Sequence, residues 1–152
     1  MKRTFSLIPA VLVLILATSA AQAGVLAAST RQTFTTPITT SLNNLKLDDA
    51  GATSLTFTTA TTQTVVITYS TDCKVATSGN VVAVVIYVDG VAAAGTGASS
   101  AGSHLCSTDI PTAGSRTAFI TVGPGTHTLQ ITGQVLGSGT GTLYRTTTTV
   151  LN

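Results

Sequence analysis

Residues 126–135 read THTLQITGQV, and this run decides the class of fold. Apolar side chains and His127 occupy alternate positions, and polar side chains fill most of the positions between them. Successive side chains of a β-strand point to opposite faces of a sheet, so this two-residue period predicts a strand with one buried and one solvated face. We expect the inward set to be His127, Leu129, Ile131 and Val135, and the outward set to be Thr126, Thr128, Gln130 and Thr132.

The rest of residues 24–152 has the same character. Short runs of Thr, Val, Ile, Tyr and Phe, which favour strands, are interrupted by Gly, Pro, Asn, Asp and Ser. Strands are predicted at residues 30–36, 54–59, 64–70, 81–88, 91–94, 116–122, 126–136 and 142–150. This pattern predicts an all-β fold, a single antiparallel β-sandwich domain of about seven or eight strands, jelly-roll-like or immunoglobulin-like, over residues 24–152.

Three further strands show which side chains they bury. Residues 81–88 are apolar at almost every position, which predicts a central strand covered on both faces. Asp89-Gly90 follows directly and suits a type I′ hairpin turn, because both residues tolerate positive φ. Two sets of side chains are expected to share a buried face within their own strands: Val65, Ile67 and Tyr69 in one, and Ala118, Ile120 and Val122 in the other.

Residues 1–23 have the three parts of an export signal. Lys2 and Arg3 form a positive start, residues 7–17 form an apolar run, and Ala21-Gln22-Ala23 forms a small-x-small cleavage site. An uncleaved membrane anchor or an N-terminal core helix is the alternative. The apolar run is well short of the roughly 20 residues that span a bilayer, which argues against the anchor. We therefore expect residues 1–23 to be a signal peptide and the product to be secreted, periplasmic or held at the cell surface.

Charge is scarce in the sequence. The 152 residues include 7 Lys or Arg and 5 Asp, with no Glu and no Trp. Without Lys2 and Arg3, the basic and acidic side chains balance. A neutral surface this poor in Lys and Arg cannot neutralise many phosphates, so the composition argues against nucleic acid as a partner. It also provides no basic patch for an anionic membrane, and no segment after residue 23 is long and apolar enough to span one.

Cys73 and Cys106 are the two cysteines of the chain. In an oxidising compartment, an even number of cysteines indicates a disulfide first. With His104 and His127 they would also complete a Cys2His2 set, but the C-x-x-C and H-x3–5-H spacings of zinc modules are absent. We predict a disulfide between Cys73 and Cys106, and no metal site of this kind.

No catalytic constellation is evident in the sequence. Asp48 and Asp49 are adjacent, which is typical of a turn, and no G-x-S-x-G elbow occurs. His127 is expected to be a packed core residue, and His104 has no partner near it in sequence. We therefore expect no enzymatic activity and no cofactor. A calcium site that uses Asp48 and Asp49 stays open, although the D-x-[DN]-x-[DN]-G pattern is absent.

Threonine accounts for 32 residues and recurs at a spacing of two. If such strands lie side by side, their outward threonines form a flat array of hydroxyl and methyl groups, able to order water or to contact sugars. The alternative is that threonine, with its high strand propensity, simply fills exposed positions. The pairs are Thr33 with Thr35, Thr56 with Thr58, Thr62 with Thr64, Thr126 with Thr128, and Thr146 with Thr148.

Residues 86–91 (IYVDGV) and 125–130 (GTHTLQ), with Cys73 and Cys106 around them, resemble a loose group of exported bacterial β-sandwich proteins. Those proteins carry an I-x-V-D-G hairpin, a cysteine pair and a late G-T-H-T strand, and the resemblance covers residues 55–150. It implies a jelly-roll-like sandwich and no established activity. Pilus subunits assembled by chaperones share the leader and cysteine pair, but their first cysteine usually lies close to the mature N-terminus.

These observations favour a non-catalytic protein that acts through its surface, in a structural, self-associating or adhesive role. The expected partners are copies of itself or an extracellular polymer. Low charge leaves strand edges open to pairing, and residues 24–40, which carry the strand-like Thr33-Phe34-Thr35, are expected to add to the sheet of a neighbouring copy. The alternative is a monomer whose first strand belongs to its own sheet. The alternative function is an extracellular ligand-binding module for carbohydrate or ice, whose binding residues the sequence does not identify.

The first testable prediction concerns maturation. Exported protein should begin at Gly24, because Ala21 and Ala23 supply the small residues that signal peptidase requires. Intact-mass measurement of secreted material checks this, and a mass that includes Met1 would contradict it.

Overall fold

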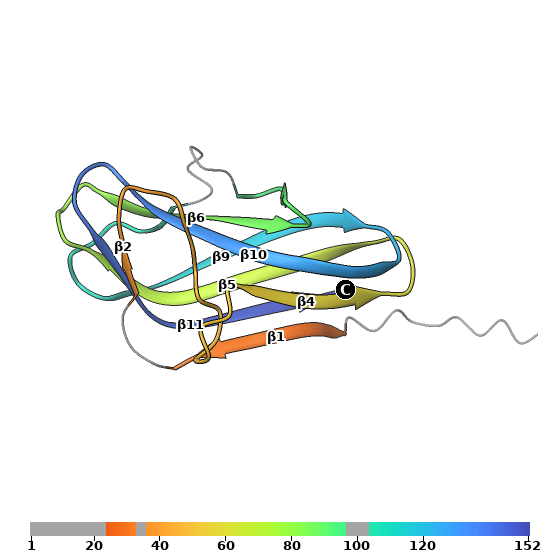
Figure 1. Cartoon of the computed structure of the whole chain (residues 1–152). Coiled ribbons are helices and arrows are strands. Elements are labelled where there is room, and N and C mark those ends of the chain that lie inside the picture. Colours follow the sequence, from red (N-terminus) through yellow and green to blue (C-terminus); the bar gives the residue numbers. More distant parts are fainter. Residues whose placement is uncertain (1–23, 33–35, 97–103) are drawn as a thin grey trace, which may run out of the picture.

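Two antiparallel β-sheets form the structure (Figure 1). It is a computed structural model that describes residues 24–32, 36–96 and 104–152, and within these residues it contains eleven strands. No helix among the described residues is long and apolar enough to cross a membrane.

The strands divide into two sheets. Sheet A has the order β1 (Val25–Arg31), β11 (Gly141–Leu151), β5 (Gln63–Val75) and β9 (Thr112–Val122), with β2 (Thr36–Ile38) also paired to β11. Sheet B has the order β3 (Asn43–Asn44), β10 (Gly125–Leu136), β6 (Val81–Val88) and β7 (Val91–Ala92). In sheet B, β4 (Ser54–Thr59) also pairs with β10, and β8 (His104–Cys106) pairs with β6.

The strand pairs are nested along the chain. The outermost pair is β1 with β11, followed inward by β4 with β10, β5 with β9, and β6 with β7 and β8. The chain is thus one long hairpin, rolled so that β11 also pairs with β5 and β10 also pairs with β6. This is a jelly roll, the double-sheet form of the Greek key. The predicted fold class is confirmed, and the jelly-roll form is the one observed.

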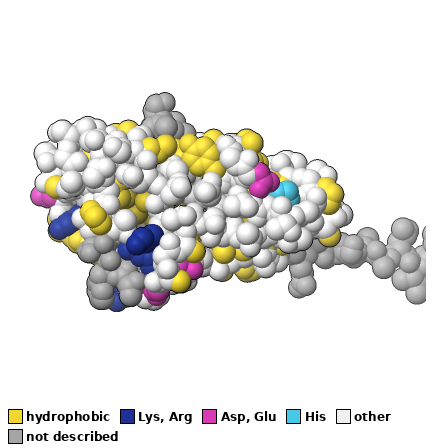
Figure 2. Space-filling view, viewed as in Figure 1, with side chains coloured by type: hydrophobic (Ala, Val, Ile, Leu, Met, Phe, Trp, Pro, Cys, Tyr) yellow, Lys and Arg dark blue, Asp and Glu magenta, His cyan; other side chains and the backbone are white. Residues whose placement is uncertain are grey.

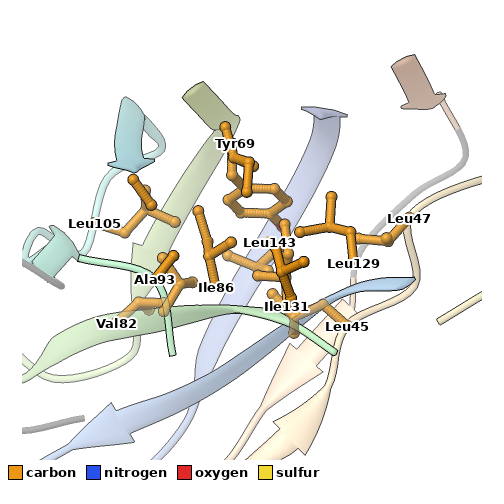
Figure 3. Close-up of a cluster of buried hydrophobic side chains, with 14 of the residues drawn as sticks. Leu45, Leu47, Tyr69, Val82, Ile86, Ala93, Leu105, Leu129, Ile131 and Leu143 are labelled. Carbon is orange, nitrogen blue, oxygen red and sulfur yellow. The ribbon is translucent and has the colours of Figure 1, made fainter. Parts of the chain in front are cut away.

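The core lies between the two sheets and follows the two-residue alternation of the strands. Tyr69 and Leu143 of sheet A lie against Ile86, Leu129 and Ile131 of sheet B (Figure 3). All five side chains are fully buried. Burial of each aliphatic side chain of this kind contributes roughly 1.5–3 kcal/mol to folding, so the pairing register that aligns them is strongly favoured.

The buried faces predicted from the sequence are confirmed in three strands. In β5 and β9, the side chains of Val65, Ile67, Tyr69, Ala118 and Val122 are buried, and Ile120 is partly buried against the core. In β10 the inward residues are buried as expected. One outward residue of β10 differs: Thr132 is also buried. It pairs with Val85 of β6, a strand that is buried on both faces over most of its length.

The turn between β6 and β7 is also as predicted. Asp89 has a φ of 51° and Gly90 a φ of 79°, and a type I′ turn requires positive φ at both positions. The turn brings Val88 opposite Val91.

Strand boundaries differ from the predictions where inward positions are polar. β5 continues to Val75 and β9 begins at Thr112, so both strands are longer than predicted. The prediction stopped short because the inward positions in the added parts hold Thr71, Cys73 and Gly114, which give no strong apolar pattern. The strand predicted at residues 30–36 is instead β1 and β2, with residues 33–35 outside the described part of the chain.

The expectation that residues 24–40 add to a neighbouring copy is wrong for the described part of this segment. β1 pairs with β11 of its own chain from Val25 to Arg31, and β2 pairs with β11 further along (Figure 1). The Arg31 side chain is only 4% exposed, which fixes the end of β1 inside the sandwich. The first strand therefore belongs to its own sheet.

Cys73 and Cys106 are disulfide-bonded, with their Cα atoms 6.1 Å apart. Cys73 lies within β5 rather than after its end, and Cys106 ends β8. The bond therefore joins sheet A to sheet B.

Removal of β1 should unfold the domain. Deletion of residues 24–31 would expose the edge of β11. The buried side chains of Thr146 and Thr148 would also lose the β1 residues that lie opposite them. We predict loss of the cooperative thermal transition measured by circular dichroism. Thr30→Ala, which alters only an exposed side chain of the same strand, should change the free energy of unfolding by no more than about 0.5 kcal/mol. A truncated protein that melts like the full-length chain would contradict this account of β1.

Candidate functional site

The outer face of sheet A carries an array of hydroxyl groups. Directly opposed residues of antiparallel strands share a face, so the pairing register shows which side chains lie side by side. Nine outward Ser and Thr side chains come together from four strands. We call this surface, together with the apolar residues between them, the hydroxyl face; its nine hydroxyl residues are Thr30, Thr64, Thr68, Ser70, Ser115, Thr117, Thr121, Thr147 and Thr149.

These side chains form rows that cross the strands. Three of the four rows are rich in hydroxyl groups, and one is apolar. In order along the sheet, the rows are Thr64 with Thr121; Val25, Leu151, Val66 and Phe119; Ala28, Thr149, Thr68 and Thr117; and Thr30, Thr147, Ser70 and Ser115.

Neighbouring hydroxyls between β5 and β9 are within hydrogen-bonding distance of each other. The Oγ1 atoms of Thr64 and Thr121 are 2.9 Å apart, and the Oγ atoms of Ser70 and Ser115 are 3.0 Å apart. The equivalent distance between Thr68 and Thr117 is 3.3 Å. A hydroxyl can donate one hydrogen bond and accept two, so each pair keeps acceptor capacity for a partner.

The four rows contain no charged side chain. Asp72 and Arg145 lie beyond the last row, where they help to line a shallow hollow of about 390 Å³ with Ser70, Ser115 and Thr147. Charge is sparse elsewhere too. Figure 2 shows one face of the molecule on which most of the described surface is neither charged nor hydrophobic, and the Lys and Arg side chains gather near one end.

The threonine pairs singled out in the sequence lie in different parts of the structure. Thr64 lies on the hydroxyl face, and Thr33 and Thr35 lie outside the described residues. A smaller second patch forms on sheet B from two other pairs, where Thr56 opposes Thr128 and Thr58 opposes Thr126. Together these placements show a Ser and Thr array that spacing within single strands did not reveal.

The pair Thr146 and Thr148 does not form an exposed ladder, and that prediction is wrong. Both side chains are buried, and the intervening Thr147 and Thr149 face outward. The four consecutive threonines conceal which positions point inward. Val150, which is buried, was the signal that could have assigned them, because Thr146 and Thr148 share its parity.

Polar groups also lie inside the sandwich beneath this face. Arg31 and Thr146 are directly opposed, and Tyr69 opposes Thr148. All four side chains are buried. Burial raises the pKa of the Tyr69 phenol well above its usual value, against smaller opposing effects of the nearby Arg31 charge and of Thr146, so the phenol stays neutral.

His127 and Asp89 form a close polar contact away from that face. Nδ1 of His127 is 2.7 Å from Oδ2 of Asp89, and Nε2 is 3.0 Å from the carbonyl oxygen of Gly123. A carbonyl oxygen and an ionised carboxylate both accept hydrogen bonds, so these two contacts favour the protonated imidazole, in which each ring nitrogen donates. The Asp89 hydrogen bond is the main cause that raises the pKa of His127, against desolvation; the Gly123 carbonyl and the Asp89 charge add to it. The same bond, followed by the Thr128 amide, lowers the pKa of Asp89.

The order Asp89, His127 and Thr59 has the arrangement of a catalytic triad but not its chemistry. Nε2 of His127 is 3.2 Å from Oγ1 of Thr59, and that hydroxyl donates to the Gly123 carbonyl at 2.5 Å. Thr59 is buried, and its proton already has an acceptor. While the imidazole is protonated, it cannot act as the base for this hydroxyl. The cluster therefore joins the turn after β6 to β4 and β10.

The remaining candidate residues have structural positions. Oδ1 of Asp48 accepts a hydrogen bond from the Ala52 amide at 2.8 Å, as in a turn, and Oδ1 of Asp49 accepts one from the Gln32 amide at 3.0 Å. His104 is partly buried in β8. Among the described residues, no three His, Cys, Asp or Glu side chains gather closely enough to hold a metal ion.

Comparison with known proteins relates the chain to others by fold. No protein-family model matches the chain, and no curated protein matches its sequence. The VP2 subviral particle of infectious bursal disease virus is similar in structure, with a TM-score of 0.50 and 16% identity over 95% of this chain and 37% of that chain. At this identity the likeness concerns the fold alone, and this chain spans little more than a third of the viral protein.

Two other solved structures are less similar. Dimeric latent PorU from Porphyromonas gingivalis has a TM-score of 0.39 at 11% identity, over 87% of this chain and 14% of that chain. The carbohydrate-binding module of Cellvibrio mixtus lichenase 5A, in complex with cellotriose, has a TM-score of 0.31 at 12% identity, over 82% of this chain and 97% of that chain. Neither bears on the function of this chain.

The His127–Asp89 pair should make stability depend on pH in a defined window. The raised pKa of His127 stabilises the fold below its usual value of 6.5, and this contribution is lost as pH rises through the raised pKa. The lowered pKa of Asp89 stabilises the fold above its usual value of 3.8, and this contribution is lost as pH falls through the lowered pKa. The pair therefore contributes most between these two values.

The variant Asp89→Asn tests this, because asparagine tolerates the positive φ of the turn. We predict a loss of about 0.5–1 kcal/mol in the free energy of unfolding at about pH 5, and a smaller loss at about pH 9, measured by urea denaturation. Asp109→Asn, in an exposed segment, serves as the control. An equal loss at both pH values would contradict the assigned ion pair.

Proposed function

We propose that the chain is an exported, non-enzymatic β-sandwich module that acts by association through the hydroxyl face of sheet A. The partner is an extracellular polymer or further copies of the chain. The role is structural or adhesive rather than catalytic.

The observation that carries this proposal is the hydroxyl face itself. Soluble proteins usually place charged side chains on exposed strands, where they hinder association. Four adjacent strands of this chain instead present Ser, Thr and apolar side chains without a charge between them. Such a surface is inexpensive to desolvate compared with a charged one, because no ion must leave water.

Two features support the other parts of the proposal. The cleavable leader predicted at residues 1–23 and the disulfide between Cys73 and Cys106 both suit an oxidising, extracytoplasmic location. The cluster of His127, Asp89 and Thr59 uses its donors to hold the turn after β6 and the turn between β9 and β10, which favours a role without catalysis.

Charge placed on the hydroxyl face should abolish association. The test variant is Thr117→Lys with Thr147→Lys, two exposed residues in different rows. The matched control is Thr56→Lys with Thr126→Lys, two exposed residues on sheet B that are also not directly opposed. Each variant adds two charges and breaks one cross-strand hydroxyl pair, so the location of the charges is the main difference.

Association is measured in two ways: sedimentation velocity over a concentration series, and retention on microcrystalline cellulose and on chitin. We expect the wild-type protein to associate in at least one assay, the sheet A variant to lose about tenfold or more in affinity, and the sheet B variant to keep it. A wild-type protein that is monomeric and unretained would contradict the proposal. Equal behaviour of the two variants would contradict it as well.

A further inference from the structure

An apolar row crosses the hydroxyl face from one margin to the other. Val25, Leu151, Val66 and Phe119 are consecutive neighbours on β1, β11, β5 and β9. The two end residues are well exposed, Val25 at 64% and Phe119 at 48%. Hydroxyl residues flank the row on both sides, with Thr64 and Thr121 on one side and the row that contains Thr68 and Thr117 on the other.

The apolar row leads into a hollow at the edge of β9. This hollow, of about 410 Å³, is lined by Phe119, Thr121, Val91 and Ala94 among others. Val91 is 60% exposed although it is a large apolar residue. The row and the hollow together therefore form a continuous track, apolar along its centre and bordered by hydroxyl groups.

The size of the face disfavours a second copy of the chain as its occupant. Four strands at about 4.8 Å each cover a width of about 19 Å, and four rows two residues apart cover about 27 Å along the strands. The resulting flat area of roughly 500 Å² is below the roughly 800 Å² of accessible surface that each partner contributes to a stable protein interface. A copy-to-copy contact through this face alone would be weak.

An added peptide strand is also disfavoured at the point where the track crosses the edge of β9. The backbone amide and carbonyl of Phe119 both bond to Ala94, at 2.9 Å each. These are the groups that an incoming strand would need. The edge is thus already occupied beside the exposed ring.

We infer that this track binds an extended chain of a neutral polysaccharide, an inference that rests on the proposed function of the hydroxyl face. A sugar ring presents C–H groups on its faces and hydroxyl groups at its edges. Laid along the apolar row, the ring faces meet Val66 and the Phe119 ring, and the edge hydroxyls meet Ser and Thr hydroxyls that both donate and accept. The absence of charge from the rows matches an uncharged polymer.

A polymer also resolves the difficulty of size. The track is narrow, so a single contact is weak, but one polysaccharide chain offers the same contact to many protein molecules and many chains lie side by side in an insoluble polymer. Repeated weak contacts then give strong retention.

The experiment measures retention of the purified protein on microcrystalline cellulose and on chitin, with cross-linked anionic pectin as a charged comparison. We expect retention on at least one of the two neutral polymers and none on pectin. Phe119→Ser should lower the affinity about tenfold, and Phe119→Tyr, which keeps the ring, should bind like the wild type. Ile110→Ser removes an even more exposed apolar side chain away from the track, and it should change the affinity by less than about twofold.

The outcomes separate this inference from the proposed function. Concentration-dependent self-association that is lost in Thr117→Lys with Thr147→Lys, without retention on either neutral polymer, would overturn the polysaccharide inference and leave the surface role intact. Retention that is unchanged in Phe119→Ser, or lost equally in Ile110→Ser, would overturn the assigned track. Equal retention on pectin would overturn the preference for a neutral polymer. A wild-type protein that neither self-associates nor binds either neutral polymer would overturn both.

Discussion

The register of β5 between β11 and β9 determines which side chains of sheet A enter the core. Residues of odd number from Val65 to Val75 face inward, and those of even number from Thr64 to Ser70 face outward. A slip of one residue would exchange the two sets and expose Tyr69. The disulfide at Cys73 and the burial of Tyr69 hold this register, so the same constraint produces the core and the hydroxyl face together.

The proposed function rests on the outward set of side chains. Threonine suits an exposed strand because its branched side chain favours the extended backbone and its hydroxyl stays hydrated. The sequence uses it where other proteins use Lys or Glu, so neighbouring strands present hydroxyl and methyl groups with no charge between them. The apolar row that contains Val66 and Phe119 runs across the strands of this face toward the hollow beside Val91.

Features that depend on the alternation of residues within one strand could be predicted from the sequence, and features that depend on which strands pair could not. The inward residues of β10, the Asp89-Gly90 turn and the sandwich follow from local patterns of two to ten residues. The rows of the hydroxyl face depend on the register between strands that are far apart in the chain. The hydrogen bond between His127 and Asp89 likewise joins residues that are 38 positions apart in the sequence. The position of β1 could not be predicted for the same reason, because the residue pattern of an N-terminal strand is the same whether it pairs with its own sheet or with that of another copy.

The register of β5 can be measured directly by nuclear Overhauser effects in solution. The backbone of Phe119 bonds outward to Ala94, so its pair with Val66, and by alternation the pair of Thr68 with Thr117, lack direct hydrogen bonds and bring their Cα atoms to about 4.5 Å. This account predicts strong Hα–Hα contacts between Val66 and Phe119 and between Thr68 and Thr117. Contacts from Thr68 to Arg116 or Ala118 in their place would mean a shifted register, and would contradict both the core and the hydroxyl face described above.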